Sequence, residues 1–155
     1  MNNLKKIVEA LKNTDFEGKS EEAQKIIDSG DLQKANLFLG RELDKKPKSA
    51  NLLFTMAGLL EEQGENMVAM DYYDRFLAIK HDDAAIYNKA RILIDELDEF
   101  EEGLKTIKLF RDDDELEQRI QELKANALLN LEKFKECEKI CKKIMKVDPN
   151  LSSCI

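Results

Sequence analysis

The sequence predicts an all-helical fold, an α-solenoid of about four similar helical hairpins preceded by an extra N-terminal helix. The composition favours helix, because charged residues make up 37% of the 155 residues and the chain holds only 6 Gly and 2 Pro. Apolar residues recur at helical spacing, as in Leu53, Met56 and Leu60. Residues that favour turns recur at an interval of 34, the spacing between Gly30 and Gly64. A constant period indicates stacked copies of one structural unit.

The predicted turns keep this register along the chain. The same step leads from Gly64 to Asp98 and on to Glu132. We expect each of these positions to separate the two helices of one hairpin. A slot for a small residue follows five positions after each turn, where the two helices must approach closely. The residues in this slot are Ala35, Ala69, Gly103 and Cys137.

The second repeat, residues 50–83, resembles a known family most closely. Its large first-helix residue is Leu53, Ala57 and Ala69 take small positions, and the second helix carries Tyr73 and Phe76. In these residues the chain resembles the tetratricopeptide repeat family. The resemblance implies a repeat domain at residues 16–155, with hairpins at about 16–49, 50–83, 84–117 and 118–151. Residues 1–15 are expected to form a helix that caps the first repeat.

The alternative architecture is a plain helical bundle. A bundle would share the amphipathic spacing of apolar residues, but it has no reason to keep a 34-residue register.

The net charge of −7 limits the classes of partner. Nucleic acid phosphates and anionic membranes would be repelled, so we expect a protein or peptide partner and neither nucleic acid nor membrane binding. No stretch has the apolar length of a signal peptide or a membrane span, which predicts a cytoplasmic protein. The cysteines, Cys137, Cys141 and Cys154, gather near the C-terminus and are expected to be reduced thiols.

The sequence offers no motif for catalysis, so we expect no enzyme and no cofactor. Cys137 and Cys141 have a helical spacing that could place two thiolates on one metal ion, but they occupy core positions and lack further ligands. The run Asp112 to Asp114 lacks the glycine of a calcium loop and is expected to begin a helix instead.

The resemblance implies that the first helix of each hairpin builds an inner, concave wall. Of its twenty exposed positions, seven hold acidic residues and only one, Arg119, holds a basic residue. We predict that this mainly acidic groove binds a basic or amphipathic peptide or helix of a partner, as an adaptor would. The predicted groove residues are Phe54, Glu61, Glu62, Asn88, Ile92, Asp95, Glu96, Glu122 and Asn126. The alternative is a solvated acidic face that binds nothing.

The sequence bears on two other roles. Some members of this family dock acidic chaperone tails through a clamp of Lys, Arg and Asn, but the corresponding positions here include Ser20, Gln24, Phe54 and Gly58, which disfavours that role. The other is a self-assembling scaffold or an accessory subunit of a larger complex. It would act through an exposed C-terminal hairpin, where the chain could form a homodimer over Ile140, Ile144, Met145 and Val147.

Overall fold

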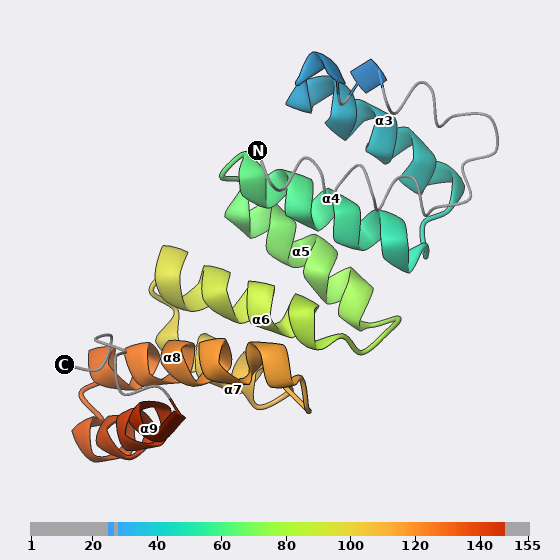
Figure 1. Cartoon of the computed structure of the whole chain (residues 1–155). Coiled ribbons are helices and arrows are strands. Elements are labelled where there is room, and N and C mark those ends of the chain that lie inside the picture. The colour runs from blue at the N-terminus through green and yellow to red at the C-terminus, as the bar shows by residue number, and fades with distance from the viewer. Residues whose placement is uncertain (1–24, 27, 148–155) are drawn as a thin grey trace. The chain divides into compact units, whose positions relative to one another are not determined.

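The computed structural model describes residues 25–26 and 28–147 of the chain (Figure 1). Within these residues the regular structure is helical and contains no strand, which confirms the all-helical part of the predicted fold class there. The chain divides into two compact units, one ending at His81 and one beginning at Asp82. This boundary falls next to the predicted junction between the second and third repeats. The predicted N-terminal cap, residues 1–15, lies outside the described residues.

Unit 1 contains α3 (Leu32–Lys45), α4 (Ala50–Glu62) and α5 (Asn66–Leu77). Helix α4 packs against both α3 and α5. Asn36 of α3 and Gln63 at the end of α4 exchange two side-chain hydrogen bonds: Asn36 Nδ2 donates to Gln63 Oε1 at 2.8 Å, and Gln63 Nε2 donates to Asn36 Oδ1 at 2.9 Å. This amide pair fixes α3 against α4 with each partner satisfied.

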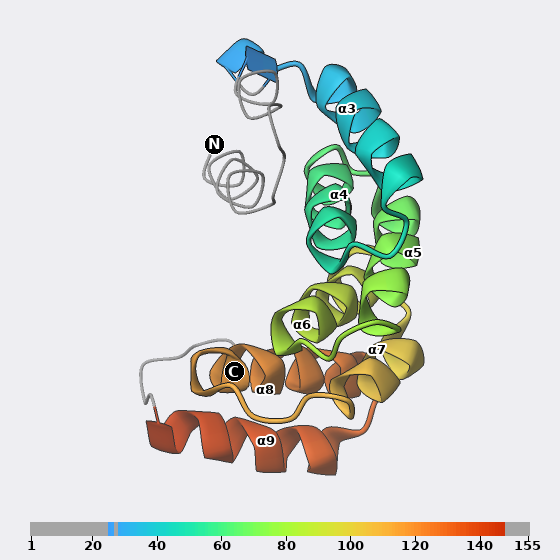
Figure 2. The same ribbon diagram turned by 90° about the vertical axis from the view of Figure 1, so that its right-hand side faces the viewer.

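Unit 2 begins with α6 (Asp83–Arg91), which continues directly into a short π-helix, η1 (Ile92–Glu96). It is followed by α7 (Phe100–Ile107), α8 (Asp114–Asn130) and α9 (Phe134–Val147). Helix α6 pairs with α7, and α8 forms a hairpin with α9, which lies beside it in Figure 2. Helix α6 also packs against α8, so the two hairpins of this unit share a core.

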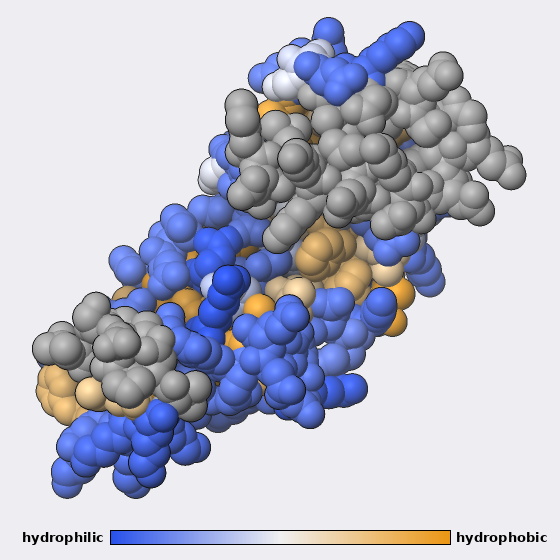
Figure 3. Space-filling model, viewed as in Figure 1, coloured by the Kyte–Doolittle hydropathy of each residue, from blue (hydrophilic) through white to orange (hydrophobic). Residues whose placement is uncertain are grey.

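Each unit has its own apolar core. Among the most completely buried side chains are Leu39, Leu53, Leu59 and Tyr73 in unit 1 and Ile86, Ile92, Ile94 and Ile120 in unit 2. Burial of each such side chain contributes roughly 1.5–3 kcal/mol to folding. Away from the cores, hydrophilic residues dominate the face seen in Figure 3, and apolar residues show only in small areas between them.

Several helices begin at a side chain that accepts hydrogen bonds from free backbone amides. Asp31 caps α3 by accepting from the amides of Gln33 and Lys34 at 3.1 and 3.2 Å. Asp113 caps α8 in the same way, accepting from the amides of Glu115 and Leu116. The acidic run at residues 112–114 therefore starts a helix, as predicted.

The predicted turns share one backbone conformation. Gly30, Gly64, Asp98 and Glu132 adopt positive φ angles of 67°, 76°, 55° and 59°. This left-handed conformation ends a helix by turning the chain back, and it costs least at glycine. The 34-residue register of turns read from the sequence is thus present in the backbone.

The small-residue slot is buried at every predicted position: Ala35, Ala69, Gly103 and Cys137. At Gly103 the approach is close, because a Cβ atom there would overlap Ile94 Cγ1 and lie 2.8 Å from Ile94 Cδ1. The predicted close approach of two helices is confirmed at this position.

Candidate functional site

An open groove of about 420 Å³ lies on unit 2 between its helices. Polar side chains and an apolar floor both contribute to it. Its lining residues are Tyr87, Asp95, Arg119, Glu122, Leu123, Ala125, Asn126, Leu129, Cys137 and Cys141. Asp95, Glu122 and Asn126 belong to the predicted groove residues, so the fold brings these three together.

The π-helix η1 determines which residues reach this groove. The amide of Leu97 donates to the carbonyl of Ile92 at 3.1 Å, five residues back, which is the hydrogen bond of a π-turn. The wide turn buries the three consecutive apolar residues Ile92, Leu93 and Ile94 and leaves Asp95 exposed. A regular α-helix would have turned one member of this apolar run toward solvent.

The π-turn also corrects the predicted register of α6. Such a turn holds one residue more than an α-helical turn, so residues before it are displaced by one position from the 34-residue pattern. Ile92, predicted as an exposed apolar anchor, is instead fully buried, with 0% exposure. Tyr87 lines the groove and also packs against the apolar core of unit 2. Asn88, a predicted groove residue, is half-buried and does not belong to the lining.

Hydrogen bonds position the polar side chains of the groove. Asn126 Nδ2 donates to Asp95 Oδ1 at 3.1 Å, which links α8 to η1. Asn130 Nδ2 donates to Asn126 Oδ1 at 3.0 Å and thereby fixes the orientation of that amide. Gln118 Nε2 donates to Glu122 Oε1 at 3.3 Å. Because a carboxylate accepts several hydrogen bonds, Asp95 and Glu122 keep capacity for a bound cation.

Tyr87 lies among charges of both signs. Its pKa is raised above the ordinary value, first because partial burial disfavours the charged phenolate. Arg119 acts in the opposite direction through its positive charge and a side-chain hydrogen bond. Asp95 and Glu122 raise the pKa further, because their negative charges oppose a second anion. The lining described by the structure therefore presents two carboxylates and one cation, and that cation acts electrostatically on the tyrosine.

Glu96 lies outside the groove lining. Its side chain is exposed, and Oε1 lies 3.8 Å from Arg91 Nη1, an ion pair that partly neutralises it. At this distance between exposed side chains the pair contributes little stability.

The remaining predicted residues belong to unit 1. Phe54 is half-buried and packs its ring against Tyr73 and Phe76 of α5, with centroid distances of 5.8 and 5.2 Å, so part of it belongs to the α4–α5 core. Glu61 is also half-buried, and its Oε2 accepts a hydrogen bond from the hydroxyl of Tyr73 at 2.6 Å. Glu62 is exposed.

The cysteines of α9 pack inside the α8–α9 hairpin. Cys137 and Cys141 are buried with Ala125, Leu128 and Ile144, and their sulfurs lie 4.0 Å apart. The Cys137 thiol is free, and Cys154 lies outside the described residues. In the described part of the chain no three metal-ligating side chains come together around these cysteines or elsewhere.

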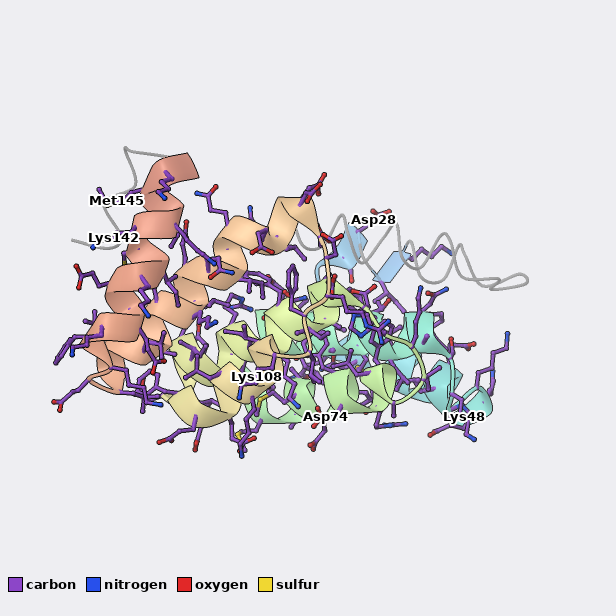
Figure 4. The ribbon with its side chains drawn as sticks, turned by 90° about the horizontal axis from the view of Figure 1, so that it is seen from below. Asp28, Lys48, Asp74, Lys108, Lys142 and Met145 are labelled. Carbon is purple, nitrogen blue, oxygen red and sulfur yellow. The ribbon has the colours of Figure 1, made fainter. Side chains whose placement is uncertain are left out.

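The surface of the C-terminal hairpin differs from expectation. Ile140 and Ile144 pack against α8 in the hairpin core, whereas Met145 is 42% exposed on the outer side of α9 (Figure 4). Among the described side chains, the apolar surface predicted for self-association is therefore smaller than the sequence suggested, and the side chain of Val147 lies outside them. None of the described helices combines the length and apolar character needed to cross a bilayer.

The chain matches no model of a protein family and no curated protein. The resemblance to tetratricopeptide repeats therefore rests on the residues of this chain.

Proposed function

We propose that the chain is a protein-binding adaptor built from tetratricopeptide-like hairpins, and that the groove of unit 2 holds a basic or amphipathic segment of a partner. The repeat assignment is supported by the left-handed turns at Gly30, Gly64, Asp98 and Glu132, which keep a constant spacing in the sequence. Buried small residues follow each of these turns.

The observation that carries the proposed ligand class is the pairing of Asp95 with Asn126 beside Glu122. Two carboxylates on one groove attract a lysine or arginine side chain, and amide groups next to them can bond a peptide backbone. The only cation in the lining, Arg119, interacts with Tyr87. The groove thus favours a positively charged ligand over a negative one.

The groove also offers apolar contact. Leu129 is 52% exposed at its edge, and Leu123 and Ala125 lie deeper in the lining. An exposed leucine next to carboxylates suits an amphipathic helix, which presents apolar and basic side chains on adjoining faces.

A binding titration tests this proposal. The probe is a labelled amphipathic peptide of Lys and Leu, and its counterpart carries Glu in place of each Lys. Asp95→Asn combined with Glu122→Gln preserves side-chain shape and removes both charges. This variant should bind the basic peptide about five- to tenfold more weakly, with a smaller dependence on salt.

The matched control is Glu101→Gln combined with Glu115→Gln, which makes the same change in net charge at exposed positions outside the groove. Its affinity should equal that of the wild type. An equal loss in both variants would mean that only net charge attracts the peptide. Equal binding of the acidic counterpart would also contradict the proposal.

A further inference from the structure

A second groove, of about 410 Å³, lies on unit 1 between α3 and α5. These two helices lie on the same side of α4 in Figure 2. The residues that matter here are Leu37, Gly40 and Arg41 of α3, and Tyr72 and Arg75 of α5. None of them belongs to the acidic groove predicted from the sequence.

The charge of this second groove is opposite to that of the protein as a whole. Arg41 and Arg75 are both exposed, and Asp44 is the only carboxylate in the lining. Arg41 forms no ion pair within the described residues. In a chain with a net charge of −7, two guanidinium groups at one groove stand out as a local positive site.

The loop after α3 extends this positive site. A shallower cavity lined by Lys46, Pro47, Lys48 and Ser49 adjoins the groove and shares Pro47 with it. Figure 4 shows Lys48 at the outer edge of the unit. Lys45 does not add to this positive site, because its Nζ pairs with the carboxylate of the buried Glu42 at 3.5 Å, near the negative end of the α3 dipole. Arg75 also lies in the last turn of its helix, α5, where the helix dipole favours a basic side chain.

Two features prepare the groove for a ligand. The guanidinium carbon of Arg75 lies 5.0 Å from the centre of the Tyr72 ring, a cation–π contact that restricts its motion and leaves its N–H groups available. Leu37 is 62% exposed and lies one helical turn from Gly40, where the missing side chain leaves the groove open. A Cβ at Gly40 would meet no atom within 4 Å.

We infer that this groove is a docking site for an acidic peptide segment of a partner protein that carries one large apolar side chain. Carboxylates of the segment pair with Arg41 and Arg75, whose planar groups suit bidentate contact. The apolar side chain lies on Leu37 above Gly40. This site is separate from the proposed acidic groove of unit 2 and takes a ligand of the opposite charge, so the chain would hold two different segments.

The sharpest test fills the groove without disturbing the core. Gly40→Leu places a side chain in open space and replaces a helix-breaking residue by a strong helix former, so the fold should be retained. The probe is a labelled acidic peptide with a single Leu, measured by fluorescence anisotropy on the full chain. Gly40→Leu should weaken its binding at least about tenfold.

The matched control is Gly58→Leu, since a Cβ at Gly58 also meets no atom within 4 Å and this residue of α4 does not line the groove. It should bind the acidic peptide like the wild type. A second control peptide has Ser in place of Leu, and it should bind more weakly if the apolar contact matters. Circular dichroism of each variant shows that helicity is kept.

The charged contacts are tested separately. Arg41→Gln combined with Arg75→Gln should weaken binding about tenfold and flatten its salt dependence, whereas Lys105→Gln combined with Lys108→Gln on unit 2 should have no effect. If wild type does not bind the acidic peptide, or if Gly40→Leu leaves binding unchanged, the inference is overturned. Concentration-dependent dimerisation that Gly40→Leu abolishes, without peptide binding, would assign the groove to a second copy instead.

Discussion

Gly103 of α7 lies directly against Ile94 of η1, so closely that no side chain at this position would fit without movement. A Cβ atom at Gly103 would lie 2.8 Å from Ile94 Cδ1 and would overlap Ile94 Cγ1. The contact joins the end of the π-turn to the next helix. Since η1 carries Asp95, this packing also supports the groove of unit 2.

We therefore expect Gly103→Ala to destabilise the protein, although alanine normally favours helix over glycine. Overpacking of a filled core costs roughly 1–3 kcal/mol, which exceeds the gain of about 1 kcal/mol from helix propensity. Gly58→Ala is the control, because a Cβ there meets nothing within 4 Å and only the propensity gain should appear. Urea denaturation measures both changes, and they should have opposite signs.

A variant at Ile94 tests whether its contact with residue 103 causes the loss of stability in Gly103→Ala. If the clash is the cause, Ile94→Ala should cost less stability in the Gly103→Ala background than in the wild type, so the two changes should not be additive. Additive losses would show that the two side chains do not compete for the same space.

The register of hairpins could be predicted from the sequence because it depends on local chemistry. Gly30 and Gly64 predict turns because glycine favours them. The 34-residue spacing between these glycines then predicts turns at Asp98 and Glu132, although neither residue type indicates a turn by itself. The groove was predicted less well, although Asp95, Glu122 and Asn126 do lie in its lining.

The errors have one main physical source. The π-turn at residues 92–96 depends on how Ile92 and Ile94 pack in three dimensions, and it displaces the preceding residues by one position. A strictly periodic sequence pattern does not reveal such an insertion, so it predicts Ile92 on the solvent-exposed face. The hydrogen bond between Tyr73 and Glu61 was also invisible, because it joins two helices through side-chain geometry alone.

The left-handed turns lead to a second prediction. Asp98 and Glu132 hold positive φ angles of 55° and 59° that favour glycine. Asp98→Gly and Glu132→Gly should each stabilise the fold by about 0.5–1 kcal/mol, with the larger gain at Glu132 because aspartate tolerates this conformation better than glutamate. Thermal melts measure the effect. Gly64→Ala should lower the melting temperature, and a rise there would contradict the turn assignment.

The third prediction concerns the bond between α5 and α4. Tyr73→Phe removes the hydroxyl that donates to Glu61 at 2.6 Å and should cost about 1–2 kcal/mol, because a hydrogen bond to a charged group is stronger than average. Tyr72→Phe is the control, since it keeps the ring that contacts Arg75. Equal losses in both variants, measured by urea denaturation, would contradict a specific role for the Tyr73 hydroxyl. By the same reasoning Glu61→Lys should also be destabilising, although the sequence placed Glu61 fully in solvent.

The last prediction uses the raised pKa of Tyr87. The phenol should titrate above its ordinary value of about 10, and the difference in near-ultraviolet absorbance between wild type and Tyr87→Phe isolates its titration. Arg119→Gln should raise this pKa further, because the arginine lowers it through its charge and hydrogen bond, whereas Asp95→Asn should lower it.

The raised pKa of Tyr87 also makes the stability of the fold depend on pH, and the direction follows from which state keeps the proton. A folded-state pKa above the unfolded value means that the folded protein keeps its proton while the unfolded chain loses it, so the contribution is complete below about pH 10 and disappears as pH rises through the folded-state pKa. If Arg119→Gln lowered the pKa of Tyr87, Arg119 would not be the partner of this hydroxyl, and the electrostatic description of the groove would be wrong.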